Sequence, residues 1–400
     1  MTSEFEAGEG SGKLRWRVGN TLPVLSAVAV LAACGGGSTV DRLRAPLSNA
    51  VNPGKELSVI DLSVVGDATR SLDPCVAGQE PLPPWSFGRI MQIVADQAGA
   101  PDASAFVKDW LDTWTTEQVV NGHVLEPVGI DQFVTIPWLA ASGGDRLDLG
   151  RAYFRLLSIV NRIDLSTQDG KGEFRMEYVA TNVFCQPIHF WVILEFELPV
   201  ESLDDLRGLA QRWHALSNKQ FGEDYNAALQ AITDDLTSAR LKHVNTVEEE
   251  ASVLEWNFRS FAIVGQSLVN VPMFQSPDVL DDGTPPLVAW VNGNQDSILA
   301  DQHVVPDELL GGDTRNIDWI GIGFQDPIEV RHHFALATCN GCHGGETATD
   351  FTHMRWRHQG EQTVLSPYLT GESIVDPMGV PRTFNELGRR ASIVQSLLVP

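Results

Sequence analysis

The sequence predicts an α+β protein, with a large mixed α/β N-terminal domain followed by a small, mainly helical C-terminal domain. Two observations carry this prediction. Strand-like runs follow one another with helices between some of them, without the regular β–α–β alternation of a parallel sheet. The last quarter of the chain instead has a Cys/His motif between apolar helix-like stretches. Four hundred residues suffice for two domains, and the apolar fraction of 43% with 11 Trp excludes a disordered chain.

Residues 55–326 are expected to form the large domain. Apolar and polar residues alternate over 57–65, which predicts a half-buried strand. Residues 104–118 carry an apolar stripe at helical spacing, and residues 189–198 are nearly continuously apolar, as in a central strand. The other predicted strands are 154–164, 173–181, 254–264 and 268–274, and the other helices are 84–98, 203–217 and 222–241.

Residues 1–33 read as an export leader, and residues 34–54 as a flexible tether. Lys13, Arg15 and Arg17 precede an apolar run over 24–33 that is too short to span a bilayer permanently. Glycine, serine and polar residues follow. No later apolar segment is long enough to cross a membrane, so the body is expected to be periplasmic or on the surface.

Leu31-Ala32-Ala33-Cys34 resembles a bacterial lipobox. This resemblance implies that Cys34 is acylated and becomes the N-terminus, so that the lipid bilayer is a partner. Gly35 after the cysteine implies the outer membrane, facing the periplasm or the cell surface. The alternative is an ordinary signal peptide in which Cys34 is incidental.

The charge and the remaining cysteines limit the partners further. A formal net charge of −24 disfavours nucleic acid as a partner.

Of the five cysteines, Cys75 and Cys185 are left over once the leader and the C-terminal motif are set aside. In an oxidising compartment we expect them to form a disulfide, although two buried free thiols are the alternative.

The chemistry concentrates in Cys339-Asn340-Gly341-Cys342-His343. Two thiols three residues apart can each add across a vinyl group of a porphyrin, and the adjacent His343 can then bind the iron. The motif resembles that of single-haem c-type cytochromes. This resemblance implies one covalent haem c, a cytochrome c-like domain over 327–400, electron transfer and a redox partner protein. The rest of the chain resembles uncharacterised bacterial lipoproteins that bear the same pentapeptide.

The second axial iron ligand is left open between Met378 and His353. Met378 lies beside a proline on a loop, as the ligand methionine of class I cytochromes does, and His353 would give a bis-histidine iron of lower potential. The basic and aromatic cluster Arg355-Trp356-Arg357 is predicted to bind the haem propionates or to dock an acidic redox partner. The alternative is a solvated turn with one buried Trp. A terminal helix over 383–398 is expected to close over the haem domain.

Two alternatives to haem remain. Cys339 and Cys342 can form a disulfide, or they can bind zinc together with His343 and His353. No catalytic residue is predicted, because the large domain contains no nucleotide-binding, phosphate-binding or nucleophile motif. The sequence therefore favours an electron-transfer protein over an enzyme with its own substrate. The run Glu248-Glu249-Glu250 is interpreted as a solvated face.

Overall fold

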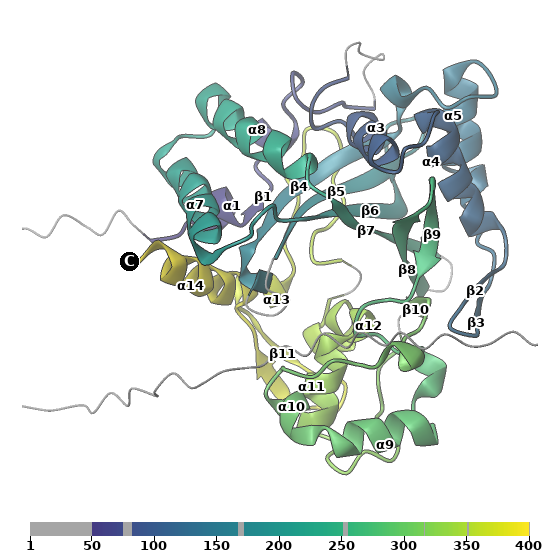
Figure 1. The fold of residues 1–400 in the computed structure, drawn as a ribbon, viewed down its shortest axis with the longest axis vertical. Coiled ribbons are helices and arrows are strands. Elements are labelled where there is room, and N and C mark those ends of the chain that lie inside the picture. The colour runs from purple at the N-terminus through teal and green to yellow at the C-terminus, as the bar shows by residue number, and fades with distance from the viewer. Residues whose placement is uncertain are drawn as a thin grey trace, which may run out of the picture. The chain divides into compact units, whose positions relative to one another are not determined.

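The computed structural model describes residues 50–74, 82–166, 172–250, 255–315, 317–349 and 352–399. Residues 49–400 form one compact unit, built around an eight-stranded antiparallel sheet in the order β1-β4-β5-β6-β7-β8-β10, with β9 paired to β8 (Figure 1). The strands of this sheet are β1 (Ser58–Val59), β4 (Phe154–Arg162), β5 (Glu173–Thr181), β6 (Pro187–Glu197), β7 (Leu241–Glu250), β8 (Glu255–Val264), β9 (Ser267–Val271) and β10 (Asp313–Arg315).

Two hairpins and a set of helices complete the described part of the chain. The hairpins are β2 (Gln118–Val120) with β3 (His123–Leu125), and β11 (Ser373–Val375) with β12 (Pro381–Thr383). The helices are α1 (Pro53–Glu56), α2 (Leu62–Val65), α3 (Phe87–Gln97), α4 (Ala103–Asp112), α5 (Thr135–Ser142), α7 (Leu203–His214), α8 (Glu223–Thr237), α9 (Pro285–Gly293), α10 (Gln295–Leu299), α11 (Glu329–Ala337), α12 (Cys339–Cys342), α13 (Pro367–Thr370) and α14 (Glu386–Leu398).

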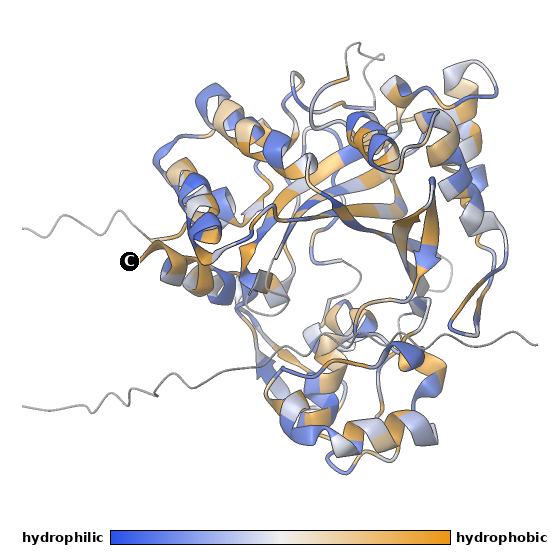
Figure 2. Ribbon diagram, in the orientation of Figure 1, coloured by the Kyte–Doolittle hydropathy of each residue, from blue (hydrophilic) through white to orange (hydrophobic). Residues whose placement is uncertain are grey.

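One face of the sheet carries the main hydrophobic core. Side chains alternate along a strand, so Phe174, Met176 and Tyr178 of β5 point to the same face, opposite to Val179. Helices α3, α4, α7 and α8 contribute apolar side chains to this core, and the orange strands in Figure 2 run beneath them. This arrangement confirms the predicted α+β class.

The second face of the sheet lies toward the Cys/His motif. A smaller apolar cluster forms there, and Cys339 packs against it. Its buried members are Leu157, Val179, Trp191, Val247, Trp256, Phe258 and Met273. When both faces of a strand are buried, the side chains on each face must be apolar or have a polar partner. This explains the nearly continuous apolar run of β6.

The three strands predicted over 154–164, 173–181 and 189–198 are confirmed as β4, β5 and β6, and the helix predicted over 203–217 as α7. The strand predicted over 57–65 is wrong for most of its length, because only β1 forms there, between α1 and α2. Capping explains the difference: Asn52 and Asp61 each accept a hydrogen bond from a backbone N–H of the helix that follows them.

Strand β7 was missed, because the helix predicted over 222–241 ends at Thr237 and the acidic run after it was interpreted as a solvated face. That interpretation is wrong for Glu248, which lies on a central strand and is buried. Its carboxylate accepts a hydrogen bond of 3.1 Å from the Asn257 amide. A partner on the neighbouring strand lowers the cost of burying such a group, and the local sequence does not show that partner.

The C-terminal helix α14 packs into the main core instead of closing over a separate haem domain. Leu387 and Val394 belong to the core cluster of the large sheet, as does Leu369 just after the start of α13. The predicted boundary at residue 326 therefore does not separate two compact bodies. The expected position of α14 was wrong because an amphipathic helix specifies a buried face but not the surface that covers it.

Candidate functional site

The pentapeptide Cys339–His343 begins directly after α11 and forms the single turn of α12. The Thr338 hydroxyl caps this turn by accepting a hydrogen bond of 3.2 Å from Gly341 N–H. The Trp319 indole N–H lies 3.0 Å from both the Thr338 hydroxyl and the Asn340 amide oxygen. A Cβ on Gly341 would lie 1.9 Å from the Ala335 carbonyl oxygen, so only glycine permits this close approach to α11. The two residues between the cysteines thus fix the conformation of the motif.

Cys339 and Cys342 are both free thiols and are half-buried. Burial raises the pKa of Cys339 to about 12 and that of Cys342 to about 11, so both remain protonated at neutral pH. The alternative of a Cys339–Cys342 disulfide is therefore not the state of this structure. Cys185 is disulfide-bonded; Cys75 and Cys34 lie outside the described residues, so the Cys75–Cys185 pairing and the acylation of Cys34 stay predictions.

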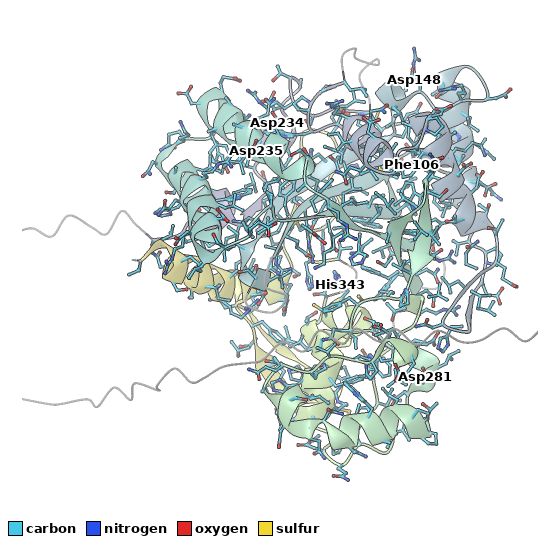
Figure 3. All side chains as sticks on the ribbon, viewed as in Figure 1. Phe106, Asp148, Asp234, Asp235, Asp281 and His343 are labelled. Carbon is cyan, nitrogen blue, oxygen red and sulfur yellow. The ribbon has the colours of Figure 1, made fainter. Side chains whose placement is uncertain are left out.

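His343 lies beside aromatic rings on the sheet side of α12 (Figure 3). Its imidazole centroid is 5.6 Å from the ring of Phe258, a member of the apolar cluster on the second face of the sheet. On the other side, the imidazole of His353 is 4.4 Å away, and that ring stacks on Tyr368 at 4.7 Å. The motif histidine is thus enclosed by aromatic side chains from β8 and from the loop that follows α12.

The structure brings His353 to the motif. Its Nε2 lies 3.3 Å from Cys342 Sγ, and its Nδ1 lies 2.9 Å from the Ser366 hydroxyl. Burial, with His343 and arginines nearby, lowers the pKa of His353 well below its usual value, so the ring is neutral. Met378 instead sits on the turn between β11 and β12 and is 40% exposed.

The cluster Arg355-Trp356-Arg357 does not act as one unit. Arg357 is buried against the large sheet and donates to the carbonyl oxygens of Val65 and Leu156 at 3.3 and 2.9 Å. The Trp356 side chain is 39% exposed. Arg357 therefore holds this loop on β4.

The thiols and imidazoles of the motif do not form a preassembled metal site. Within the described part of the chain, one group of three His, Cys, Asp or Glu side chains has its ligand atoms within 4.8 Å of one another, and this group is His332, Glu346 and Asp376. The zinc alternative at Cys339, Cys342, His343 and His353 therefore lacks the required convergence in this conformation.

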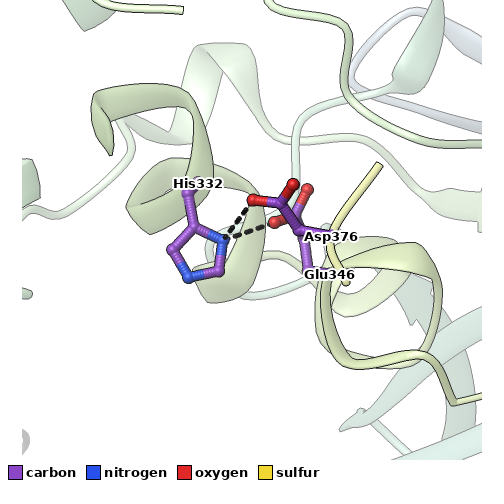
Figure 4. A group of neighbouring side chains, drawn as sticks. All are labelled: His332, Glu346 and Asp376. Atoms are coloured by element: carbon purple, nitrogen blue, oxygen red, sulfur yellow. Dashed lines mark hydrogen bonds and ion pairs between the residues drawn. The ribbon is translucent and has the colours of Figure 1, made fainter. Parts of the chain in front are cut away.

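The group of His332, Glu346 and Asp376 is part of an ion-pair network (Figure 4). His332 Nδ1 lies 2.5 Å from a Glu346 carboxylate oxygen, and the same carboxylate binds Arg331. Asp376 accepts from Arg382 Nε at 2.9 Å. Both carboxylates are thus already neutralised by guanidinium groups, which would also repel a cation. The network connects α11, the loop after the motif, and the β11–β12 hairpin.

A set of buried and half-buried charged side chains beside the second face of the sheet was not predicted. Arg162 forms a two-bond ion pair with Asp164, at 3.0 Å for each bond. Arg175 binds Glu173 and Glu195, and Arg390 of α14 donates to Glu386 at 2.9 Å. No motif marks these residues, because they come from elements far apart in the sequence. The one available signal was the charge at alternate positions of otherwise apolar strands.

We expect the Asp164→Asn variant to weaken the acid dependence of stability. Burial alone would raise the pKa of Asp164, but the charges of Arg162, Arg389 and Arg390 lower it to about 2. Because this pKa is depressed, its stabilisation is complete above about pH 4 and is lost as the pH falls toward 2. The variant should lose about 2 kcal/mol of unfolding free energy at pH 7 and show a smaller loss between pH 4 and pH 2.

Urea denaturation at pH 7, 4 and 3 measures both quantities. Asp204→Asn is the matched control, because Asp204 pairs with Arg207 at an exposed site. An unchanged pH slope in Asp164→Asn would contradict the prediction.

Among the described residues, no helix combines the length and the apolar character needed to cross a membrane. No family model matches the chain. Neither the curated proteins nor the solved structures include a match to it. Its function is therefore inferred from the residues and geometry of this site.

Proposed function

We propose that the chain carries one covalent haem c, attached through Cys339 and Cys342, and that its function is electron transfer at a membrane. One observation carries the proposal: two free thiols one helical turn apart are followed by His343, beside an apolar and aromatic surface. In this view residues 327–400 are the haem-binding segment, with the large sheet beneath it.

The residues of the motif fit this cofactor. The Cys339 and Cys342 thiols lie on the same turn, so both can form thioethers on one edge of a porphyrin, and His343 can supply its imidazole to the iron. Phe258 and the apolar cluster around Cys339 exclude water from that edge. When bound, the haem supplies a one-electron Fe(III)/Fe(II) couple. Thr338, Asn340 and Gly341 hold the three attachment groups in place.

We propose His353 as the second axial ligand. The Ser366 hydroxyl orients its Nδ1, and its Nε2 faces the motif, which is the arrangement by which an outer partner directs a ligating imidazole. The two imidazoles are in contact in this structure, so they must separate to bind one iron together. Met378 remains the alternative, and its exposed turn would have to move to the motif.

Anchoring through an acylated Cys34 completes the proposal. A lipid-linked N-terminus would hold the haem body at the outer membrane, facing the periplasm or the surface, within reach of a redox partner. The strongly negative charge favours a partner with a basic docking surface. A Cys34→Ser chain expressed with export intact should leave the membrane fraction, and its retention there would contradict this anchor.

Expression of the full chain with a haem-ligation system tests the proposal. We expect a Soret band and an added haem mass that both survive acid–acetone extraction. If His353 is the second ligand, His353→Gln should open the iron to carbon monoxide and raise the midpoint potential, whereas Met378→Ala should change neither. Opening of the iron to carbon monoxide with a lower midpoint potential in Met378→Ala, and no change in His353→Gln, would assign Met378. A chain without covalent haem would overturn the proposed function.

A further inference from the structure

We infer that the second face of the large sheet forms one wall of the haem site, where Arg162, Arg175 and Arg390 bind the haem propionates. This inference rests on the proposed function and adds a role for the large domain. It assigns the carboxylate edge of the haem to residues that lie far from the motif in the sequence.

The register of the sheet places apolar and charged side chains in separate rows on this face. Val179 pairs with Trp191, Trp191 with Val247, and Val247 with Phe258, which gives an apolar row across four strands. Four residues along β5 from Val179, Arg175 pairs with Glu195, which lies opposite His243. The two rows lie about 13 Å apart along the strands.

A haem likewise has one apolar edge and one charged edge. Its vinyl edge is apolar and would be attached to the cysteines, and Cys339 packs against the apolar cluster. Its propionates are carboxylates and require charged partners if they are buried. The face of the sheet offers both environments beside one motif.

Three guanidinium groups converge at the charged end. Arg162 lies at the end of β4, and Arg175 lies on the adjacent β5, two positions from the residue that pairs with Arg162. Arg390 approaches from α14, where the adjacent Arg389 binds Asp164 at 3.1 Å, the carboxylate that also pairs with Arg162. Tyr368 of α13 stacks on His353, which contacts Cys342, and α13 packs against α14. The charged end is therefore beside the motif.

These arginines retain donors for a further anion. A guanidinium has five N–H donors. Arg390 is buried, and among the described residues only its Nε donates, to Glu386. Arg162 uses Nε and one terminal nitrogen for Asp164. Their terminal N–H groups are thus available in a region of low exposure, where a carboxylate is their strongest hydrogen-bond acceptor.

Arg390→Gln and Arg175→Gln test the inference in the loaded protein. Loss of a positive charge beside the haem favours the ferric form, so we expect the midpoint potential to become more negative in each variant. We also expect the propionate bending modes in resonance Raman spectra to shift. Arg390→Lys keeps the charge but loses the planar fork, and should shift the Raman modes while nearly preserving the potential.

Arg389→Gln is the matched control. Arg389 is the neighbour of Arg390 on α14 and binds the same Glu386, but its side chain is 46% exposed. It should change neither the potential nor the Raman modes. Loaded Gln variants that match Arg389→Gln in both readouts would overturn the inference and leave the proposed function standing. A wild-type chain that takes up no covalent haem would overturn both.

Discussion

Replacing Cys339 and Cys342 together by alanine should abolish covalent haem attachment in cells that load the wild-type chain. Within the described part of the chain, Cys339 and Cys342 are the free thiols at which thioether bonds can form. The protein should still fold, since Cys-to-Ala changes remove only two half-buried sulfur atoms. Haem staining of denatured protein and intact mass measure the loss.

Single cysteine variants sharpen this prediction. Cys339→Ala and Cys342→Ala should each retain one thioether, which gives a shifted pyridine haemochrome band and a lower yield. His358→Gln is the control, because His358 lies in the same segment but is exposed. Full loading of the double variant would show that haem is attached elsewhere, and so would refute the assignment of the pentapeptide.

The second large effect is expected at Glu346. Its carboxylate is buried and binds both Arg331 and His332, and Arg331 is fully buried. Glu346→Ala leaves that guanidinium without its main counter-ion and should lower the free energy of unfolding by about 3–5 kcal/mol. Glu346→Gln keeps hydrogen-bonding capacity and should cost less. Chemical denaturation monitored by Trp fluorescence measures both values.

A double variant shows whether the stability lost in Glu346→Ala comes from the broken ion pair or from the cavity left by the smaller side chain. Arg331→Met with Glu346→Ala removes both charges, so it should recover part of the stability lost in Glu346→Ala. Glu329→Gln is the control, because Glu329 pairs with Arg382 through a side chain that is 46% exposed. If the double variant is as unstable as the sum of the singles, the ion pair is not the source of the effect.

The local sequence predicted the central strands because a strand that is buried on both faces has a recognisable, largely apolar sequence. β6 is nearly continuously apolar, whereas charged and apolar residues alternate along part of β5, and the bounds of β4, β5 and β6 agree with the expected ones. The same reasoning failed around α1 and α2. Apolar and polar residues alternate there as in a strand, but Asn52 and Asp61 each cap a short helix. Capping is a local signal, and it could have been identified from the Asn-Pro and Asp-Leu-Ser patterns.

The structure places the two candidate iron ligands, His353 and Met378, in different surroundings. The sequence favoured Met378 over His353, although each is a suitable iron ligand downstream of the motif. Hydrogen bonds decide their positions: Ser366 and Cys342 hold His353 at the motif, whereas the Asp376 carboxylate binds the backbone of the turn that carries Met378. Neither set of contacts is encoded by spacing.

By itself, the sequence gives the Cys339–His343 pentapeptide and predicts an export leader that ends before Cys34, because both patterns are contiguous and their chemistry depends on adjacent residues. Only the tertiary structure decided what faces the motif. Phe258 reaches His343 through the register of an antiparallel sheet, and α14 takes its place by packing into the main core. Register and helix packing depend on the sum of many weak contacts between distant segments, so no local pattern specifies them.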